Sequence, residues 1–290
     1  MEKRDILIGQ GAVLLTAFLW STSGLFIKLL IEINWHPMLI AGSRSFLAAI
    51  FLLIIRLVFP PPKNAKKSSS FPLWAGAFAY AITMLSFIYA NSLTTAANAI
   101  MLQYTAPVWA ALLGWYFNRE KPHWEHWLSI ALVGGGLFLF FGDALESGAL
   151  LGNSIAIFSG LAFGATSVFM RMMKDGNPRD AMLLSHVITF AFSIPFFFLY
   201  PPEINTSSIL PVSFMGIIQI GLASLVYSYG IKKISAVQAM LTAIIEPILN
   251  PVWVLLVTGE SPSLAAIMGG GIIIFSVVLS SLIGLRRYSK

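Results

Sequence analysis

The chain has 290 residues, of which 57% are hydrophobic and only 10% are charged, and its mean hydropathy is +0.82. Soluble domains carry about 25% charged residues, so this composition excludes a soluble globular protein and indicates a membrane protein. The net charge is +6 and the chain has no cysteine, which excludes disulfides, thiolate catalysis and cysteine metal sites.

Apolar segments long enough to cross a bilayer recur ten times along the chain. A helix needs about 20 apolar residues to cross roughly 30 Å of hydrocarbon. The ten segments are 11–31, 38–58, 72–91, 96–117, 124–141, 151–173, 181–200, 209–230, 236–257 and 263–284. The first follows Lys3 and Arg4 as a signal-peptide core would, but its apolar run is too long and nine spans follow, so we expect an uncleaved helix. The pattern predicts an all-α integral membrane protein.

Lysine and arginine are unevenly distributed between the loops. If the N-terminus is cytoplasmic, the inner segments contain Lys3, Arg4, Lys63, Lys66, Lys67, Arg119, Lys121, Arg171, Lys174, Arg179, Lys232, Lys233, Arg286, Arg287 and Lys290. The outer segments contain none. This asymmetry predicts a multi-pass protein of the cytoplasmic (inner) membrane with both termini in the cytoplasm. Because the charges do not gather on one folded face, we expect no nucleic-acid partner.

The second half of the chain repeats the first at an offset of about 140 residues. TTAANAIMLQYTAPVWAALLGWYFNREKP (94–122) aligns with ISAVQAMLTAIIEPILNPVWVLLVTGESP (234–262), and AFLWSTSGLFIK (17–28) aligns with GLAFGATSVFMR (160–171). Each half has five spans, an odd number, so the second copy would enter the membrane from the opposite side. We therefore predict two inverted five-helix repeats, 1–147 and 148–290, around a central cavity, an arrangement used for alternating access.

The repeated blocks PVWAALLGWYFNREKP (107–122) and PILNPVWVLLVTGESP (247–262), together with ten spans in two halves, resemble the EamA family of the drug/metabolite transporter superfamily. The first block departs from the family pattern at Asn118 and Arg119, before Glu120. The resemblance implies that helices 1, 3, 4, 6, 8 and 9 line a central cavity, with helices 5 and 10 at the periphery. It also implies export of amino acids or other small metabolites, although uptake occurs in the family.

Glu246 is the only acidic residue in the middle of a span. It lies roughly 15 Å along its helix, at the bilayer midplane, so its carboxyl group is expected to face the interior and to be paired, hydrated or protonated. Gln238, Thr242, Glu246 and Asn250 follow at a spacing of four and would form one polar face. Two roles stay open: Glu246 binds a cationic substrate group or a proton, or it is a structural residue.

Arg44 is the only basic residue well inside a span and is the candidate ion-pair partner of Glu246. A structural position outside the main cavity is one role, because buried charges must first be satisfied. In the other role Arg44 faces the cavity and binds a substrate carboxylate. Arg44 and Glu246 would then recognise a zwitterion.

Further polar and aromatic side chains within the spans are candidates for a substrate site, with helix packing and interhelical hydrogen bonds as the alternative. The full set of predicted substrate-binding residues is Trp20, Tyr80, Asn98, Gln103, Trp109, Phe163, Gln219, Tyr227, Gln238, Thr242, Glu246 and Asn250. No catalytic residue, cofactor or metal is expected, since His123 and His126 in HWEHW offer too few ligands for zinc. Gly134–Gly136 and Gly269–Gly271 are expected to allow close helix packing.

These features favour a secondary transporter of small organic metabolites, such as amino acids or amphipathic amines, with export favoured over uptake. Its partners would be a small-molecule substrate and the lipid bilayer, with coupling to protons or to a counter-substrate, and we expect a monomer. An intramembrane enzyme would need paired acids or an activated nucleophile. A channel would need a filter sequence or a charged ring. Neither feature is evident in the sequence, but both classes remain alternatives.

Overall fold

The computed structural model describes residues 3–60, 69–94, 96–141, 150–258 and 264–287. Within these residues the regular secondary structure is entirely helical. The helices are α1 (Lys3–Ser21), α2 (Ser23–Glu32), α3 (Pro37–Val58), α4 (Ser70–Leu93), α5 (Ala96–Gln103), α6 (Ala106–Asn118), α7 (Trp124–Phe141), α8 (Leu150–Met172), α9 (Pro178–Leu199), α10 (Thr206–Phe214), the π-helical η2 (Met215–Leu222), α11 (Ala223–Gly230), α12 (Ala236–Ala243), α13 (Ile245–Thr258) and α14 (Leu264–Arg287).

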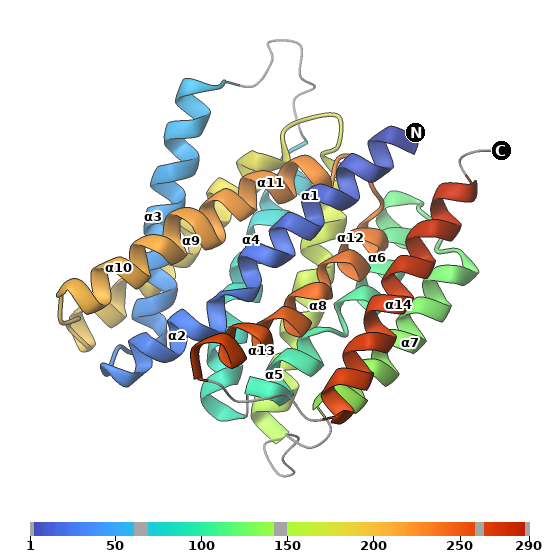
Figure 1. Ribbon diagram of the computed structural model, residues 1–290. Helices are drawn as coiled ribbons and strands as arrows, with labels where there is room; N and C mark the ends of the chain where they lie inside the picture. Colours follow the sequence, from blue (N-terminus) through green and yellow to red (C-terminus); the bar gives the residue numbers. More distant parts are fainter. Residues whose placement is uncertain (1–2, 61–68, 95, 142–149, 259–263, 288–290) are drawn as a thin grey trace.

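These elements follow the ten predicted spans in order. There are more elements than spans because several spans are divided into shorter helices. Among the described residues, six helical runs are long and apolar enough to cross a membrane: Lys3–Glu32, Pro37–Val58, Ser70–Asn91, Leu150–Met172, Pro178–Leu199 and Thr206–Gly230. Ala236–Leu249 and Ile267–Ile283 are shorter apolar helices. The start of α1 and the end of α14 lie at the same end of the molecule (Figure 1).

The interruption of the fourth and ninth spans has a cause in the sequence. The fourth span breaks at Tyr104 and Thr105, and the ninth breaks at Ile244. Pro107 and Pro247 follow these breaks, and each lacks the N–H that would bind the carbonyl four residues earlier. The two breaks therefore lie at equivalent positions when the halves are aligned at the repeat offset.

Helix α8 is central, packing against α4, α5, α6 and α12, while α7 pairs with α14 along one side (Figure 1). Glycine permits the closest approaches. A Cβ atom at Gly160 would lie 2.6 Å from the Gln103 carbonyl oxygen, and one at Gly164 would lie 2.7 Å from that of Ala106. The backbone of α8 thus lies directly against the break between α5 and α6.

The sequence predicts that the glycine runs of α7 and α14 allow close helix packing. The structure shows a close contact at one of these glycines and open space at three others. A Cβ atom at Gly136 would lie 2.6 Å from Ile273 Cγ1 and 3.0 Å from the Gly269 carbonyl oxygen. By contrast, a Cβ atom at Gly134, Gly135 or Gly271 would meet nothing within 4 Å. Gly136 therefore lies at the close contact of these two helices, whereas Gly134, Gly135 and Gly271 do not.

Candidate functional site

A cavity lies among the helices where the interrupted spans meet. Its volume is about 50 Å³, room for a few water molecules. It is lined by Trp20, Ser23, Ile27, Arg44, Tyr80, Thr83, Met84, Phe87, Gln103, Phe163, Gln219, Ile220 and Glu246. These residues come from spans 1, 3, 4, 6, 8 and 9, the set implied by the family resemblance, with Arg44 added from span 2.

Trp20 is the centre of an aromatic wall of this cavity. Its ring centroid lies 6.4 Å from that of Tyr80, 5.6 Å from that of Phe163 and 5.5 Å from that of Tyr227. The Tyr227 hydroxyl forms a hydrogen bond with Ser167 on α8. Four helices therefore meet through these rings, which present an amphipathic surface suited to an amphipathic ligand.

Arg44 is one of the residues that line this cavity. Its side chain is buried, Nη2 lies 3.3 Å from Met84 Sδ, and Nε has no hydrogen-bond partner. Gly216 allows η2 to pack closely at this point, since a Cβ atom there would lie 2.9 Å from the Arg44 carbonyl oxygen. A buried guanidinium with so few partners is costly, so this site is suited to an anionic group.

Glu246 lies on the same cavity, but it does not form the ion pair with Arg44 that the sequence suggested. Three ion pairs are formed among the described residues, and none involves either group. Instead, the Tyr104 hydroxyl donates to Glu246 Oε2 at 2.7 Å. The same hydroxyl lies 3.2 Å from the Ala243 carbonyl oxygen, which the missing N–H of Pro247 leaves free. With one O–H donor, the Tyr104 hydroxyl lies within hydrogen-bond distance of both acceptors and donates to Glu246 at the shorter distance.

Some polar side chains around the cavity are hydrogen-bonded to other protein groups, and others have a polar atom without a hydrogen-bond partner. Gln103 Nε2 donates to Ser159 Oγ at 2.8 Å, and Ser159 Oγ donates to the Thr83 carbonyl oxygen at 3.1 Å. Gln219 Nε2 donates to the Trp20 carbonyl oxygen at 3.2 Å. Among the described residues of the lining, the buried polar atoms without a hydrogen-bond partner include Trp20 Nε1, Arg44 Nε and Gln219 Oε1. Buried polar atoms are usually satisfied, so these atoms retain the capacity to bind a ligand or a water molecule.

Four predicted binding residues lie away from the cavity lining. Gln238 forms a capping box with Ser235 at the start of α12, and Thr242 donates to its own helix at the Gln238 carbonyl oxygen, 2.7 Å away. Trp109 Nε1 donates to Thr105 Oγ1 at 3.3 Å. Tyr227 does not line the cavity, and its ring centroid lies 5.5 Å from that of Trp20. The break at Ile244 places Gln238 and Thr242 on α12 and Glu246 on α13, so the three residues do not belong to one continuous helix, and the single polar face stays a prediction. The side chains of Asn98 and Asn250 lie outside the described part of the structure.

Sequence reasoning missed six lining residues. Thr83, Met84 and Phe87 follow Tyr80 on α4 at offsets of three, four and seven residues, the spacing of one helix face, so this signal was available. Ser23, Ile27 and Ile220 had no comparable signal. Ile220 and Gln219 belong to the π-helical turn η2, and such turns are frequent at functional sites.

The histidines of HWEHW have a local structural role. The His123 backbone N–H donates to His126 Nδ1 at 3.1 Å, close to the start of α7. Among the described residues no group of three or more His, Asp or Glu side chains could hold a metal ion.

Comparisons with known proteins concern the family and the fold of this chain. The model of the EamA-like transporter family matches residues 7–142 and 150–282. An uncharacterized transporter of Archaeoglobus fulgidus is 24% identical over 275 residues, covering 94% of this chain and 96% of that protein. The uncharacterized transporter YwfM of Bacillus subtilis is 22% identical and covers 93% and 92%. A crystal structure at 18% identity has a TM-score of 0.80 over 100% of both chains, which shows a shared fold.

Proposed function

Because the chain belongs to the EamA-like transporter family, we propose that it is a secondary carrier for a small organic metabolite that bears both an amino and a carboxyl group. The carrier would work in the cytoplasmic membrane, with both termini in the cytoplasm, by alternating access and in the direction of export. The charge asymmetry of the loops supports this orientation.

The observation that carries the proposal is the presence of two opposite charges on one cavity that do not pair with each other. The Arg44 guanidinium retains donors for a carboxylate. The Glu246 carboxylate binds only one side-chain donor, Tyr104, among the described residues, and it can accept from an ammonium group. A zwitterion between them would satisfy both charges at once.

The remaining lining supports a ligand with an apolar part. Trp20, Tyr80, Phe87 and Phe163 provide rings, and the free Trp20 Nε1 and Gln219 Oε1 can orient the ligand by hydrogen bonds. Ligand pockets usually span about 300–1,000 Å³, so a cavity of about 50 Å³ must widen to bind such a molecule. The equivalent breaks in the fourth and ninth spans support two inverted repeats that move against each other.

The test is counterflow in proteoliposomes with three matched ligands: an amino acid, its amide, which lacks the carboxylate, and the corresponding acid, which lacks the amine. We expect saturable exchange of the amino acid and weaker exchange of both analogues. Glu246→Gln should exchange the amino acid no faster than the acid that lacks the amine. Arg44→Gln should exchange the amino acid no faster than the amide that lacks the carboxylate. Glu203→Gln and Arg56→Gln are the controls, since both residues lie outside the cavity lining.

Flux that does not saturate and shows no exchange would favour a channel, and chemical conversion of the ligand would favour an enzyme; either result contradicts the proposal. The same vesicles test coupling when an imposed pH gradient is compared with an internal load of counter-substrate.

A further inference from the structure

A second hollow, which shares no residue with the central cavity, opens where the N-terminal end of α1 meets three other segments. Its volume is about 330 Å³, and it is lined by Asp5, Lys174, Tyr229, Lys232 and Lys233. Asp5 comes from the first turn of α1, Lys174 from the turn after α8, and Tyr229 from the end of α11. The two other lysines belong to the turn between α11 and α12.

The hollow carries more positive than negative charge, since three lysines face one aspartate. Lys233 forms an ion pair with Asp5 and lies over the Tyr229 ring, 5.4 Å from its centroid. The hydrogen bond from Lys233 to Asp5 raises the pKa of the lysine, so this ammonium stays charged. Lys232 Nζ donates to the Gly176 carbonyl oxygen at 2.9 Å, which leaves two of its three N–H donors available.

The other two ammonium groups have no acidic partner among the described residues, because neither Lys174 nor Lys232 takes part in an ion pair there. Both side chains are exposed. Asp175 is adjacent in sequence but does not line the hollow. The positive charges of Lys174 and Lys232 therefore line the hollow without a described acidic group to neutralise them.

The walls of the hollow are held in place before any ligand arrives. A Cβ atom at Gly9 would lie 2.9 Å from Lys233 Cβ, and one at Gly230 would lie 3.0 Å from the Gly9 carbonyl oxygen, so α1 lies directly against the end of α11 (Figure 1). Arg171 donates to the carbonyl oxygens of Ile231 and Lys232. The turn that carries the two lysines is thus anchored on two sides.

The position of the hollow indicates what it meets in a membrane. The apolar helix α8 ends at Met172 and α11 ends at Gly230, so Lys174 and Lys232 follow two residues beyond the ends of membrane-spanning segments. Ammonium groups at this depth lie at the level of lipid headgroups. Lysine binds phosphate as a point charge, and the half-exposed Tyr229 can add a hydroxyl donor.

We propose that this hollow is a phosphate-binding site whose ligand is the phosphodiester headgroup of an anionic phospholipid. The site does not depend on the substrate of the central cavity. Each lysine near an anionic surface contributes about a fivefold factor in binding, so removing all three is expected to weaken headgroup binding by roughly 100-fold.

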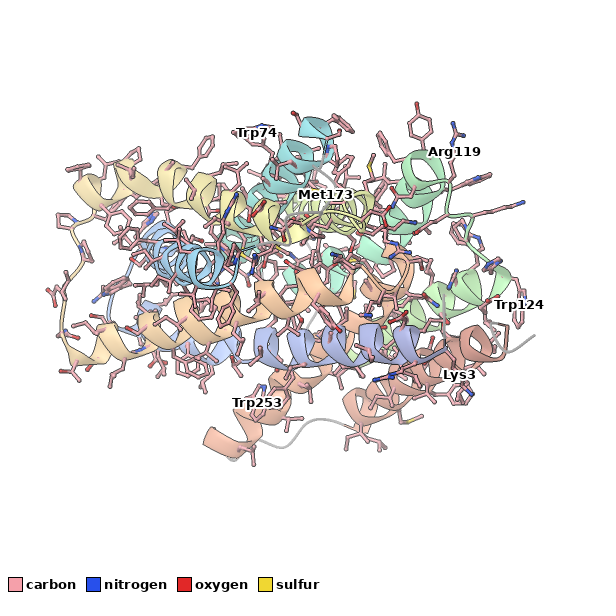
Figure 2. All side chains as sticks on the ribbon, turned by 90° about the horizontal axis from the view of Figure 1, so that it is seen from above. Lys3, Trp74, Arg119, Trp124, Met173 and Trp253 are labelled. Carbon is pink, nitrogen blue, oxygen red and sulfur yellow. The ribbon has the colours of Figure 1, made fainter. Side chains whose placement is uncertain are left out.

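The experiment is native mass spectrometry of the purified full chain, titrated separately with dioleoylphosphatidylglycerol and dioleoylphosphatidylcholine. We expect one retained molecule of the anionic lipid at concentrations where phosphatidylcholine is not retained. The combined variant Lys174→Gln, Lys232→Gln and Lys233→Gln should lose this selectivity, and the corresponding three Lys→Arg changes should keep it. The matched control is the combined variant Lys3→Gln, Arg119→Gln and Lys121→Gln, which removes three positive charges outside the hollow. Lys3 and Arg119 lie at the same end of the molecule as each other (Figure 2).

Excess inorganic phosphate distinguishes the two sources of the ligand. If phosphate leaves the lipid bound, the lipid headgroup is the ligand; if phosphate alone raises the melting temperature through these lysines and displaces the lipid, the ligand is a soluble phosphate. Equal retention of both lipids together with no effect of phosphate would overturn the site. Should the Gln variant fail to fold, Lys174→Glu alone tests the proposal, because this exposed side chain forms no ion pair in the described structure; unchanged selectivity in that variant would also overturn it.

Discussion

The Tyr104 hydroxyl donates a hydrogen bond to Glu246 Oε2 at 2.7 Å, and so joins the break in the fourth span to the start of α13. Its second contact, to the Ala243 carbonyl oxygen, involves the last residue of α12. One side chain therefore connects both interrupted helices of the two halves at the edge of the central cavity.

Replacing Tyr104 by Phe removes this hydroxyl and leaves the partly buried Glu246 carboxyl group without its side-chain donor. A hydrogen bond to a charged group contributes about 1.5–3 kcal/mol, so we expect counterflow by the Tyr104→Phe variant to fall by about ten- to 100-fold. Initial rates in proteoliposomes measure the effect. Tyr116→Phe is the control, because Tyr116 is 73% exposed; equal rates for both variants would show that the contact has no role in transport.

The pair of Arg171 and Glu120 should contribute to stability because it joins α6, α8 and α12. Arg171 Nε lies 2.8 Å from Glu120 Oε1, and the other carboxylate oxygen accepts from the Ala236 N–H at 3.4 Å. The Arg171 side chain is only 6% exposed and that of Glu120 is 24% exposed.

Breaking a fully buried pair costs about 3–5 kcal/mol. Since Glu120 is partly exposed, we expect about 2 kcal/mol for Glu120→Gln, seen as a lower melting temperature in detergent. The control is Arg56→Gln, which breaks a more exposed pair with Asp180 and should cost less than about 1 kcal/mol. A smaller loss for Glu120→Gln than for Arg56→Gln would contradict the assigned role.

Glycine at position 160 is required by the close approach of α8 to Gln103. A Cβ atom there would lie 2.6 Å from both the Gln103 carbonyl oxygen and Thr105 Oγ1, so Gly160→Ala must push the helices apart. Overpacking of this kind costs about 1–3 kcal/mol, and melting temperature again measures it. Gly135→Ala has open space and should be neutral or stabilising by up to about 1 kcal/mol. Equal melting temperatures for the two variants would exclude the close contact.

His36 should make stability depend on pH below 6.5. The residue precedes α3, its Nδ1 accepts from the Met38 N–H at 3.2 Å, and its ring stacks on Tyr200 with centroids 4.2 Å apart. Burial lowers the pKa of His36 from 6.5. Protonation also removes the Nδ1 acceptor that caps the helix.

A lowered pKa means that the unfolded chain binds the proton more readily, so the stabilisation is fully present above pH 6.5 and is lost as pH falls through the lowered value. We expect the melting temperature to fall on acidification and to fall less in His36→Asn, which keeps a capping side chain. His123→Asn replaces an exposed histidine and should leave the pH profile unchanged. An identical profile for His36→Asn and the parent protein would contradict this.

The sequence by itself determined the spans, their order and the family, because bilayer thickness and the cost of unsatisfied backbone groups leave few choices for an apolar chain. It also singled out Glu246 as a candidate binding residue, since a carboxyl group at mid-span is expected to face the protein interior whichever helices surround it. Pro107 and Pro247 similarly predict local interruptions, because proline removes the same hydrogen bond in any context.

Only the tertiary structure decided which side chains meet. Tyr104, not Arg44, contacts Glu246, and Gln238 caps its own helix and does not line the cavity. The break at Ile244 interrupts the ninth span, so residues on either side of it do not follow the spacing of one continuous helix. Periodicity describes a continuous helix. Contacts across interrupted helices depend instead on close approaches between helices, such as Gly160 to Gln103 and Gly216 to Arg44. The spacing of residues along the sequence does not predict these approaches.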